Sequence, residues 1–478
     1  MSDSLIKRAY HYLQQQQFQA ASTLYQQVLQ QQPTHSGALY GLASIALAQH
    51  QYDTAISLLQ KVCELSPTQL QPLLDLAHAF SAVGSDVDHH TVLVYALKRF
   101  NHAAEIRYQL ARHYLATGEI TQATPLFEQL LSQDNVGLIV YSLFDLVKIQ
   151  PEKSADYLRF AHSLHVKLQK PEHVYVLSYT LAQCYFNLGN MAEFAAHLEH
   201  ANQLQYQACD FKTQDLAPFF NTLSELKPAA MAPRNDSRDS LKPIFIVGLP
   251  RTGSSLLAQM LASHSQIANA GEQPFLPDTV TKLCQLTAKP YPECLASLSP
   301  ELIEQGAAYY LTQMQRFSHN KRYVIDKLPA NFQSIAAIEL MFPTALIIDL
   351  TRNNSDVALS IYQNNFAPTE PYFCDLDELA LYIGFYQRTM RHFSQLYGQH
   401  IEQVHYEALV TQPKLELSTL LQKLDLEFEE NCLAFYQHKL TVHTLSAVQI
   451  REQLHNKSIN RAQALTPYLP KLVKFSKI

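Results

Sequence analysis

The sequence predicts a chain of class α + α/β: an all-helical repeat array at residues 1–207, then an α/β domain with a parallel sheet at residues 242–478. In the first part, apolar residues recur at helical spacing, and the pattern itself repeats every 34 residues. In the second part, short apolar runs alternate with helical stretches, which is typical of a parallel sheet flanked by helices. Between them, residues 208–241 include LKPAAMAPRNDSRDSLKP, a composition typical of a linker.

Length and composition limit the possible classes of protein. A chain of 478 residues exceeds one compact core, and its apolar content of 47% lets both parts bury one. The net charge of -6 argues against a general nucleic-acid binder. No apolar run approaches the ~20 residues that span a bilayer, and the N-terminus lacks the apolar core of a signal peptide. Seven scattered cysteines without a C-x-x-C pair indicate free thiols in a reducing compartment, so we expect a soluble, cytoplasmic protein.

The repeat is defined by small residues and their large partners. When the first part is aligned with itself at a shift of 34, or of two such shifts for the last residue of the first four sets, the coinciding residues are Phe18, Tyr52 and Ile120; Ala21, Ala55 and Ala123; Tyr25, Leu59 and Phe127; Val28, Val62 and Leu130; Ala43, Ala77 and Ala111. A small residue at a fixed helical position lets a second helix approach closely. This pattern resembles the tetratricopeptide repeat, with about six copies. Such an array is either a passive scaffold or dimerisation arm, or a concave surface that holds a peptide or a partner protein. The sequence does not choose between these.

The first candidate functional element of the second part is a loop that follows a predicted strand. The runs PIFIVGL, RYVIDKL and TALIIDLTR predict buried strands, and parallel strands bring the loops after Val247, Ile325 and Leu350 to one crevice. After the first run, residues 248–255 (GLPRTGSS) fit the phosphate-loop template G-x-x-x-x-G-K-[ST], except that Ser254 replaces the lysine.

A glycine-containing loop that leads into a helix presents backbone N–H groups to an anion. Here the cation is Arg251, with Gly253 allowing close approach and hydroxyl groups from Thr252, Ser254 and Ser255. This set suits a compact sulfate or phosphate better than a metal-bound triphosphate. The alternative is a tight turn whose Ser and Thr cap a helix.

A second anion element follows the strand TALIIDLTR. Arg352 comes directly after this strand, and Ser360 follows eight residues later on the next helix. Both can contact one phosphate from two sides. The alternative is an arginine that pairs with a helix terminus.

These two elements resemble those of the sulfotransferase family, whose first signature binds the 5′-phosphosulfate of 3′-phosphoadenosine 5′-phosphosulfate and whose second binds its 3′-phosphate. The segments YVIDKLPANF, VHYEALVTQP and TLSAVQIREQLHNKSINRAQALTPYLPKL are similar to three further family motifs, so the resemblance covers residues 242–478. With the repeats in front, the chain resembles bacterial tetratricopeptide-repeat sulfotransferases. Its catalytic half is similar to the protein-tyrosine sulfotransferases, because the loop carries arginine and GEQ follows the loop helix.

The resemblance implies a role for each residue of the site. Glu272 is the expected general base, and its carboxylate is expected to be half-buried. Arg251 and Lys327 are expected to stabilise the negative charge that develops during the transfer. It implies that the donor nucleotide is bound by Arg251, Thr252, Gly253, Ser254, Ser255, Arg352, Ser360, Tyr406, Ser446 and Arg451, with Ser458 and Arg461 as weaker assignments. No metal is expected. The chain departs from the family where Gln453 replaces a proline and Ala462 a tryptophan.

The resulting prediction is an enzyme that moves a sulfonate from 3′-phosphoadenosine 5′-phosphosulfate to an acceptor hydroxyl and releases adenosine 3′,5′-bisphosphate. The repeats favour an acceptor on a protein or peptide, with tyrosine one option and a saccharide or small molecule another. The alternatives are a protein-interaction scaffold with an inert nucleotide-binding domain, and a phosphate-loop nucleotide kinase, against which the missing lysine counts.

Overall fold

The computed structural model describes residues 2–227, 241–366, 370–437 and 453–478. The chain forms two compact units, one of Met1–Tyr114 and Glu119–Leu138, the other of Leu115–Gly118 and Ile139–Ile478. None of the described helices is both long and apolar enough to cross a membrane.

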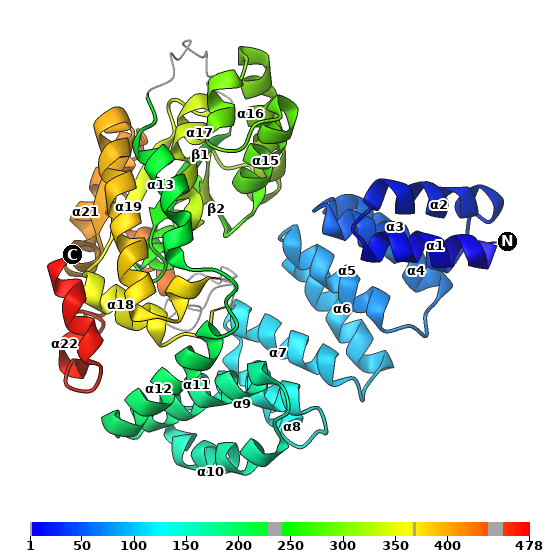
Figure 1. Cartoon of the computed structure of the whole chain (residues 1–478), viewed down its shortest axis with the longest axis horizontal. Helices are drawn as coiled ribbons and strands as arrows, with labels where there is room; N and C mark the ends of the chain where they lie inside the picture. Colours follow the sequence, from blue (N-terminus) through cyan, green and yellow to red (C-terminus); the bar gives the residue numbers. More distant parts are fainter. Residues whose placement is uncertain (1, 228–240, 367–369, 438–452) are drawn as a thin grey trace. The chain divides into compact units, whose positions relative to one another are not determined.

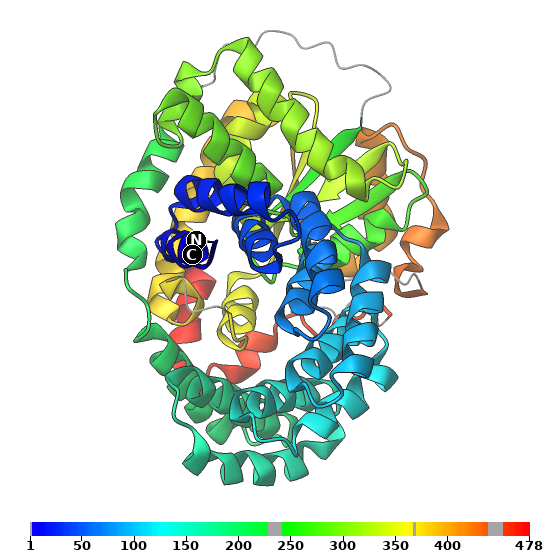
Figure 2. The same ribbon diagram turned by 90° about the vertical axis from the view of Figure 1, so that its right-hand side faces the viewer.

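The first unit consists of helices that follow one another as hairpins (Figure 2). Its helices are α1 (Ser2–Gln14), α2 (Phe18–Gln31), α3 (Ser36–Ala48), α4 (Tyr52–Leu65), α5 (Gln71–Ala82), α6 (Asp86–Arg99), α7 (Ala104–Thr117, whose last turn belongs to the second unit) and α8 (Ile120–Leu130).

Four of the five sets of predicted repeat positions form the core of these hairpins, whereas Phe18, Tyr52 and Ile120 are half-buried. The alanines of the repeat are fully buried, and so are their large partners, to within 2% exposure: Ala21, Ala55, Ala123, Ala43, Ala77, Ala111, Tyr25, Leu59, Phe127, Val28, Val62 and Leu130. In α6 the position that alanine occupies in the other repeats is taken by His89. This side chain is also buried, at 8% exposure, and its Nδ1 lies 3.0 Å from Nδ1 of His113. The larger side chain explains why the repeat is hard to see in this stretch of sequence. The expected helical repeats are confirmed.

The second unit contains helices on both sides of the predicted linker. Four precede it: α9 (Val136–Ile149), α10 (Ser154–Leu164), α11 (Pro171–Asn187) and α12 (Met191–Tyr206). Within residues 208–241, which the sequence assigned to a linker, helix α13 (Ala217–Ser224) packs beside the long helix α19 (Leu376–Tyr397) (Figure 1). Phe220 of α13 is 1% exposed and stacks at 5.0 Å on Phe385 of α19. An apolar face within a Pro- and Ser-containing segment therefore folds onto the domain.

The sheet of the second unit has five parallel strands in the order β2-β3-β1-β4-β5. The strands are β1 (Lys242–Gly248), β2 (Ile267–Gly271), β3 (Tyr323–Asp326), β4 (Leu346–Thr351) and β5 (Ile401–His405). The apolar runs predicted β1, β3 and β4, and the parallel sheet is confirmed. All five strands end at one edge, so the residues that follow them are brought together.

Helices cover this sheet because both of its faces are apolar. Successive strand residues point to opposite faces. Ile244 and Ile246 of β1 pack with the α14 helix, whereas the Phe245 ring lies 5.8 Å from the ring of Tyr310 on α16. The remaining helices are α14 (Ser254–Ala262), α15 (Phe275–Thr287), α16 (Pro300–Met314), α17 (Ile335–Met341), α18 (Asn354–Tyr362), α20 (Tyr406–Thr411), α21 (Pro413–Lys423) and α22 (Arg461–Leu465). Burial on both faces is the usual state of a parallel sheet.

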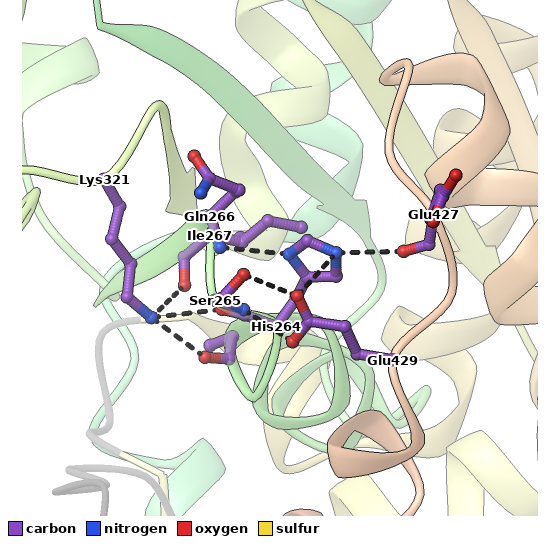
Figure 3. Close-up of polar contacts among 8 residues, drawn as sticks. His264, Ser265, Gln266, Ile267, Lys321, Glu427 and Glu429 are labelled. Carbon is purple, nitrogen blue, oxygen red and sulfur yellow. Dashed lines mark hydrogen bonds and ion pairs between the residues drawn. The ribbon is translucent and has the colours of Figure 1, made fainter.

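A polar cluster fixes the C-terminal end of α14 (Figure 3). Lys321 Nζ donates to the carbonyl oxygens of His264 at 3.1 Å and Ile267 at 2.9 Å. The amide of Gln266 donates to Nδ1 of the buried His264 at 3.0 Å, so the other ring nitrogen carries the proton and donates to the Glu427 carbonyl oxygen at 3.0 Å. Lys321 Nζ also donates to the carbonyl oxygen of Ala262, the last residue of α14, at 3.5 Å, and so satisfies a group that the helix end leaves open. These contacts hold α14 from the end opposite to its phosphate-loop-like start.

Candidate functional site

Each strand of the sheet delivers one predicted site residue at its carboxyl end. Glu272 follows β2, Lys327 follows β3, and Arg352 follows β4. Arg251 lies in the loop after β1, and Tyr406 comes directly after β5. Since carboxyl ends of parallel strands meet at one edge, this edge collects cations, a carboxylate and an aromatic ring.

The loop after β1 has a strained backbone. Arg251 is in the left-handed region with φ of 69°, and Gly253 has φ of 101°. A non-glycine residue in that region costs of the order of 1 kcal/mol, which is typical of functional loops. The Thr252 hydroxyl donates to the Leu249 carbonyl oxygen at 2.9 Å, a hydrogen bond that joins the two sides of the loop. Ser254 then begins α14, and Ser255 follows in its first turn.

Tyr406 lies against this loop. A Cβ atom on Gly253 would lie 2.5 Å from Cδ2 of the Tyr406 ring, so only glycine fits here. The Arg352 guanidinium packs over the same ring, with its Cζ 4.6 Å from the ring centroid. The ring therefore joins the first and the second predicted anion elements.

Arg251, Arg352 and Ser360 form one cluster. Arg251 Nε donates to Ser360 Oγ at 3.0 Å, and Arg352 Nη1 donates to the Arg251 carbonyl oxygen at 3.2 Å. Burial lowers the pKa of Arg251 to about 10; the nearby Arg352 charge acts in the same direction and Glu272 opposes it. Guanidinium groups repel one another, so their convergence creates a site of positive potential that an anion stabilises.

The C-terminal segment reaches the same cluster. Arg352 Nη2 donates to the Ser458 carbonyl oxygen at 2.5 Å. The carboxylate of Asp356, 2% exposed at the start of α18, accepts from the amides of Asn460 at 2.7 Å and Ala462 at 2.8 Å. Arg461 lies between these two amides in sequence. No sequence motif indicated this role for Asp356, which lies in the first turn of the helix that bears Ser360.

An ion pair between a buried cation and a partly exposed carboxylate completes the edge. Lys327, 2% exposed, donates to the carboxylate of Glu272, whose side chain is 41% exposed and thus more open than the sequence predicted. Burial lowers the pKa of Lys327, and the Glu272 charge opposes that effect. The adjacent Asp326 is turned away, because it accepts from Tyr310 Oη at 2.8 Å and from Asn331 Nδ2 at 3.1 Å. The arrangement can remove a proton at Glu272 and stabilise negative charge at Lys327 and Arg251.

Two predicted residues, Ser446 and Arg451, lie outside the described residues. The two departures from the family pattern fall on either side of the Ser458 segment: Gln453 is exposed, and Ala462 is 1% exposed. In the described part of the chain, no three His, Cys, Asp or Glu side chains are arranged to hold a metal ion.

Comparisons with known proteins match each of the two parts of the chain to a family. Residues 243–430 match the model of the sulfotransferase family, and residues 12–62 match a tetratricopeptide-repeat model. An uncharacterized protein from Aquifex aeolicus is 33% identical over 244 residues, which cover 49% of this chain and 32% of that protein. The chain thus spans about a third of the length of this relative.

A putative protein-tyrosine sulfotransferase from Caenorhabditis briggsae is 22% identical over 225 residues, 45% of this chain and 79% of that protein. Among solved structures, the sulfotransferase domain of the Synechococcus PCC 7002 olefin synthase shares 22% identity, with a TM-score of 0.37 over 52% of this chain and 98% of that one. The two family matches, at residues 243–430 and 12–62, show that the chain carries a sulfotransferase-family domain in its C-terminal half and tetratricopeptide repeats at its N-terminus.

Proposed function

We propose that the chain transfers a sulfonate group from 3′-phosphoadenosine 5′-phosphosulfate to the hydroxyl group of an acceptor. The observation that carries the proposal is the convergence of Arg251 and Lys327 on one partly exposed carboxylate, Glu272, with Arg352 bonded to the Arg251 carbonyl oxygen, in a sulfotransferase-family domain.

The residues at this edge suit an anionic nucleotide. Among the described residues, no acceptor contacts the buried Arg352 Nε, and no described carboxylate forms an ion pair with Arg352 or Arg461. A buried donor without an acceptor costs about 1–3 kcal/mol, which an anionic oxygen at that position would offset. The first amides of α14 and the loop around Gly253 suit a second anionic group. A donor that carries a 3′-phosphate and a 5′-phosphosulfate has two such groups.

The chain's own residues can then perform the transfer. The donor supplies a sulfonate that moves in line onto the acceptor oxygen. Glu272 takes the proton of the acceptor hydroxyl, because its side chain is 41% exposed and so can be reached by an acceptor. Arg251 and Lys327 stabilise the charge that develops on the transferred group and on the oxygen it leaves, an effect that reaches ~3 kcal/mol per group.

For the acceptor we propose a protein or peptide, with tyrosine as the first side chain to test. Similarity to a putative protein-tyrosine sulfotransferase supports this choice. Tetratricopeptide repeats support it as well, since stacked helix hairpins form extended surfaces for protein partners. In this proposal the repeats recruit the acceptor and the α/β domain modifies it.

A ligand-binding experiment on the full chain tests the donor. Thermal unfolding is followed with adenosine 3′,5′-bisphosphate in EDTA, and separately with ATP and Mg²⁺. We expect the bisphosphate to raise the unfolding temperature without metal, because binding to the native state stabilises it. No shift at millimolar bisphosphate, or a shift with Mg²⁺-ATP alone, contradicts the proposal; the second result favours a kinase. Transfer of labelled sulfonate to peptides that contain Tyr, or Phe in its place, tests the acceptor.

A further inference from the structure

We propose that the last two repeat helices, α11 and α12, form a wall of the donor site, and that Phe186 of α11 is a positioning residue for Arg461. This inference rests on the proposed function, because it assigns Arg461 to the donor's anionic groups. It concerns the second unit alone, since α11, α12 and the α/β domain all belong to that unit.

The first step is the contact between Phe186 and Arg461. The Arg461 Cζ lies 4.5 Å from the centroid of the Phe186 ring. That ring is held in turn by Phe194 of α12, whose centroid is 5.3 Å away in a T-shaped arrangement and whose side chain is 2% exposed. The five N–H donors of a guanidinium lie in one plane, and an aromatic ring beneath the group limits how that plane can turn. No described carboxylate pairs with Arg461, so this ring is what orients it.

The second step is where Arg461 lies. Burial lowers the pKa of Arg461; the Arg352 charge adds to this and the Asp356 charge opposes it, so all three lie within electrostatic range. The backbone on both sides of Arg461 is tied to Asp356 through the amides of Asn460 and Ala462. The backbone of Arg461 is therefore fixed by α18, which also bears Ser360, while its side chain is fixed by a repeat helix.

The third step is a polar contact between α12 and the C-terminal end of α18. Asn202 is fully buried and donates from Nδ2 to the Tyr362 carbonyl oxygen at 2.9 Å. Its own Oδ1 accepts from Tyr179 Oη of α11 at 2.8 Å. Gln205, one turn further along α12, donates to the Phe366 carbonyl oxygen. Carbonyl groups at a helix end need such partners. The repeat helices thus hold α18 at one end while Arg352 and Asp356 mark the other.

These contacts predict an effect that is confined to one side of the nucleotide. Arg461 lies beside Arg352 and Asp356, so it is placed to act on the group that Arg352 binds, which we assign to the 3′-phosphate. Loss of Phe186 then weakens binding of adenosine 3′,5′-bisphosphate more than binding of adenosine 5′-monophosphate. A purely structural role for Phe186 would weaken both ligands equally.

The test compares Phe186→Leu with Phe144→Leu in the full chain. Phe144 of α9 is a matched control, because it also packs under a cation, with Lys148 Nζ 3.8 Å from its centroid, and it belongs to a repeat helix of the same unit. Dissociation constants for the two nucleotides are measured by calorimetry. For Phe186→Leu we expect the bisphosphate to bind about 5-fold more weakly and the monophosphate to change less than about 2-fold. Phe144→Leu should leave both constants unchanged.

Rescue and failure are both informative. Phe186→Tyr keeps the ring and should restore binding of the bisphosphate. If Phe186→Leu weakens the binding of both nucleotides equally, or of neither, the inference is overturned. The proposed function is left intact in that case, as long as the wild-type protein binds the bisphosphate. If wild type itself binds no bisphosphate, the proposed function fails first. Should Phe186→Leu not fold, Arg461→Lys keeps the charge but loses the planar stacking, and the same selective loss is expected; its absence overturns the inference.

Discussion

Glu272 and Lys327 form an ion pair although 55 residues separate them in sequence. The pair exists because β2 and β3 are neighbours in the sheet, and the Lys327 amide donates to the Gly271 carbonyl oxygen at 3.0 Å directly beside it. The cation is buried and the carboxylate is partly open. This asymmetry leaves the Glu272 side chain partly exposed with a fixed positive charge beside it, which suits the role of base that we propose for it.

Replacing Glu272 by Gln should abolish transfer and keep nucleotide binding. The amide has the shape of the carboxylate but cannot accept the proton, and loss of a general base costs roughly 100- to 10,000-fold in rate. Transfer is measured with labelled donor, and binding of adenosine 3′,5′-bisphosphate by calorimetry. Glu304→Gln on the exposed side of α16 is the control. Normal transfer by Glu272→Gln means that another group is the base.

Replacing Arg352 by Ala should weaken nucleotide binding most among single substitutions at the edge. The side chain offers donors to an anion and packs on Tyr406, and a charged hydrogen bond contributes about 1.5–3 kcal/mol, or roughly 10- to 100-fold in affinity. Arg388→Ala is the matched control, since that exposed arginine also lies over a ring, 5.4 Å from the Phe385 centroid. If the two variants bound adenosine 3′,5′-bisphosphate with equal affinity, Arg352 would not be a nucleotide-binding residue.

Two glycine substitutions should have opposite outcomes. Gly253→Ala places a Cβ 2.5 Å from the Tyr406 ring at φ of 101°, so the loop must shift; we expect lower stability and loss of nucleotide binding. Gly384→Ala on α19 meets no atom within 4 Å and should raise stability by about 0.5–1 kcal/mol, because alanine favours a helix. Chemical unfolding measures both. A Gly253→Ala protein that binds the nucleotide normally contradicts the close packing described.

The buried Asp349 should make stability fall as pH rises. Burial raises the pKa of Asp349 to about 6 from its usual 3.8, although its Oδ1 accepts from Tyr386 Oη at 2.5 Å. The folded state therefore holds this proton where the unfolded state has lost it, and the resulting stability is lost as pH rises from about 4 to about 6.

Asp349→Asn removes this dependence. Relative to wild type, the variant should gain on the order of 3 kcal/mol between acidic pH and pH 7.5. Urea unfolding across that range, followed by circular dichroism, measures the difference between the two proteins. Parallel curves for the two proteins would show that folding does not raise the pKa of Asp349.

Much of the fold could be predicted because it is local. The repeat alanines and their partners are visible at fixed spacing, and the strands β1, β3 and β4 are uninterrupted apolar runs. By contrast, β2 was not predicted, since IANAG is short, lacks a β-branched run and ends in glycine. Helix α13 was also missed, because its apolar face lies in a segment whose composition is that of a linker.

The sequence by itself determined the fold class and indicated the side chains that we propose for the site, because repeat alanines, loop glycines and an arginine after an apolar run are patterns of neighbouring residues. Only the tertiary structure decided their pairings: Glu272 with Lys327, Tyr406 with Gly253, and Phe186 with Arg461. These contacts depend on strand order and on how a repeat helix packs against α18 and α22. Spacing along one chain does not encode them, since residues that are far apart meet only when the apolar faces between them have been buried.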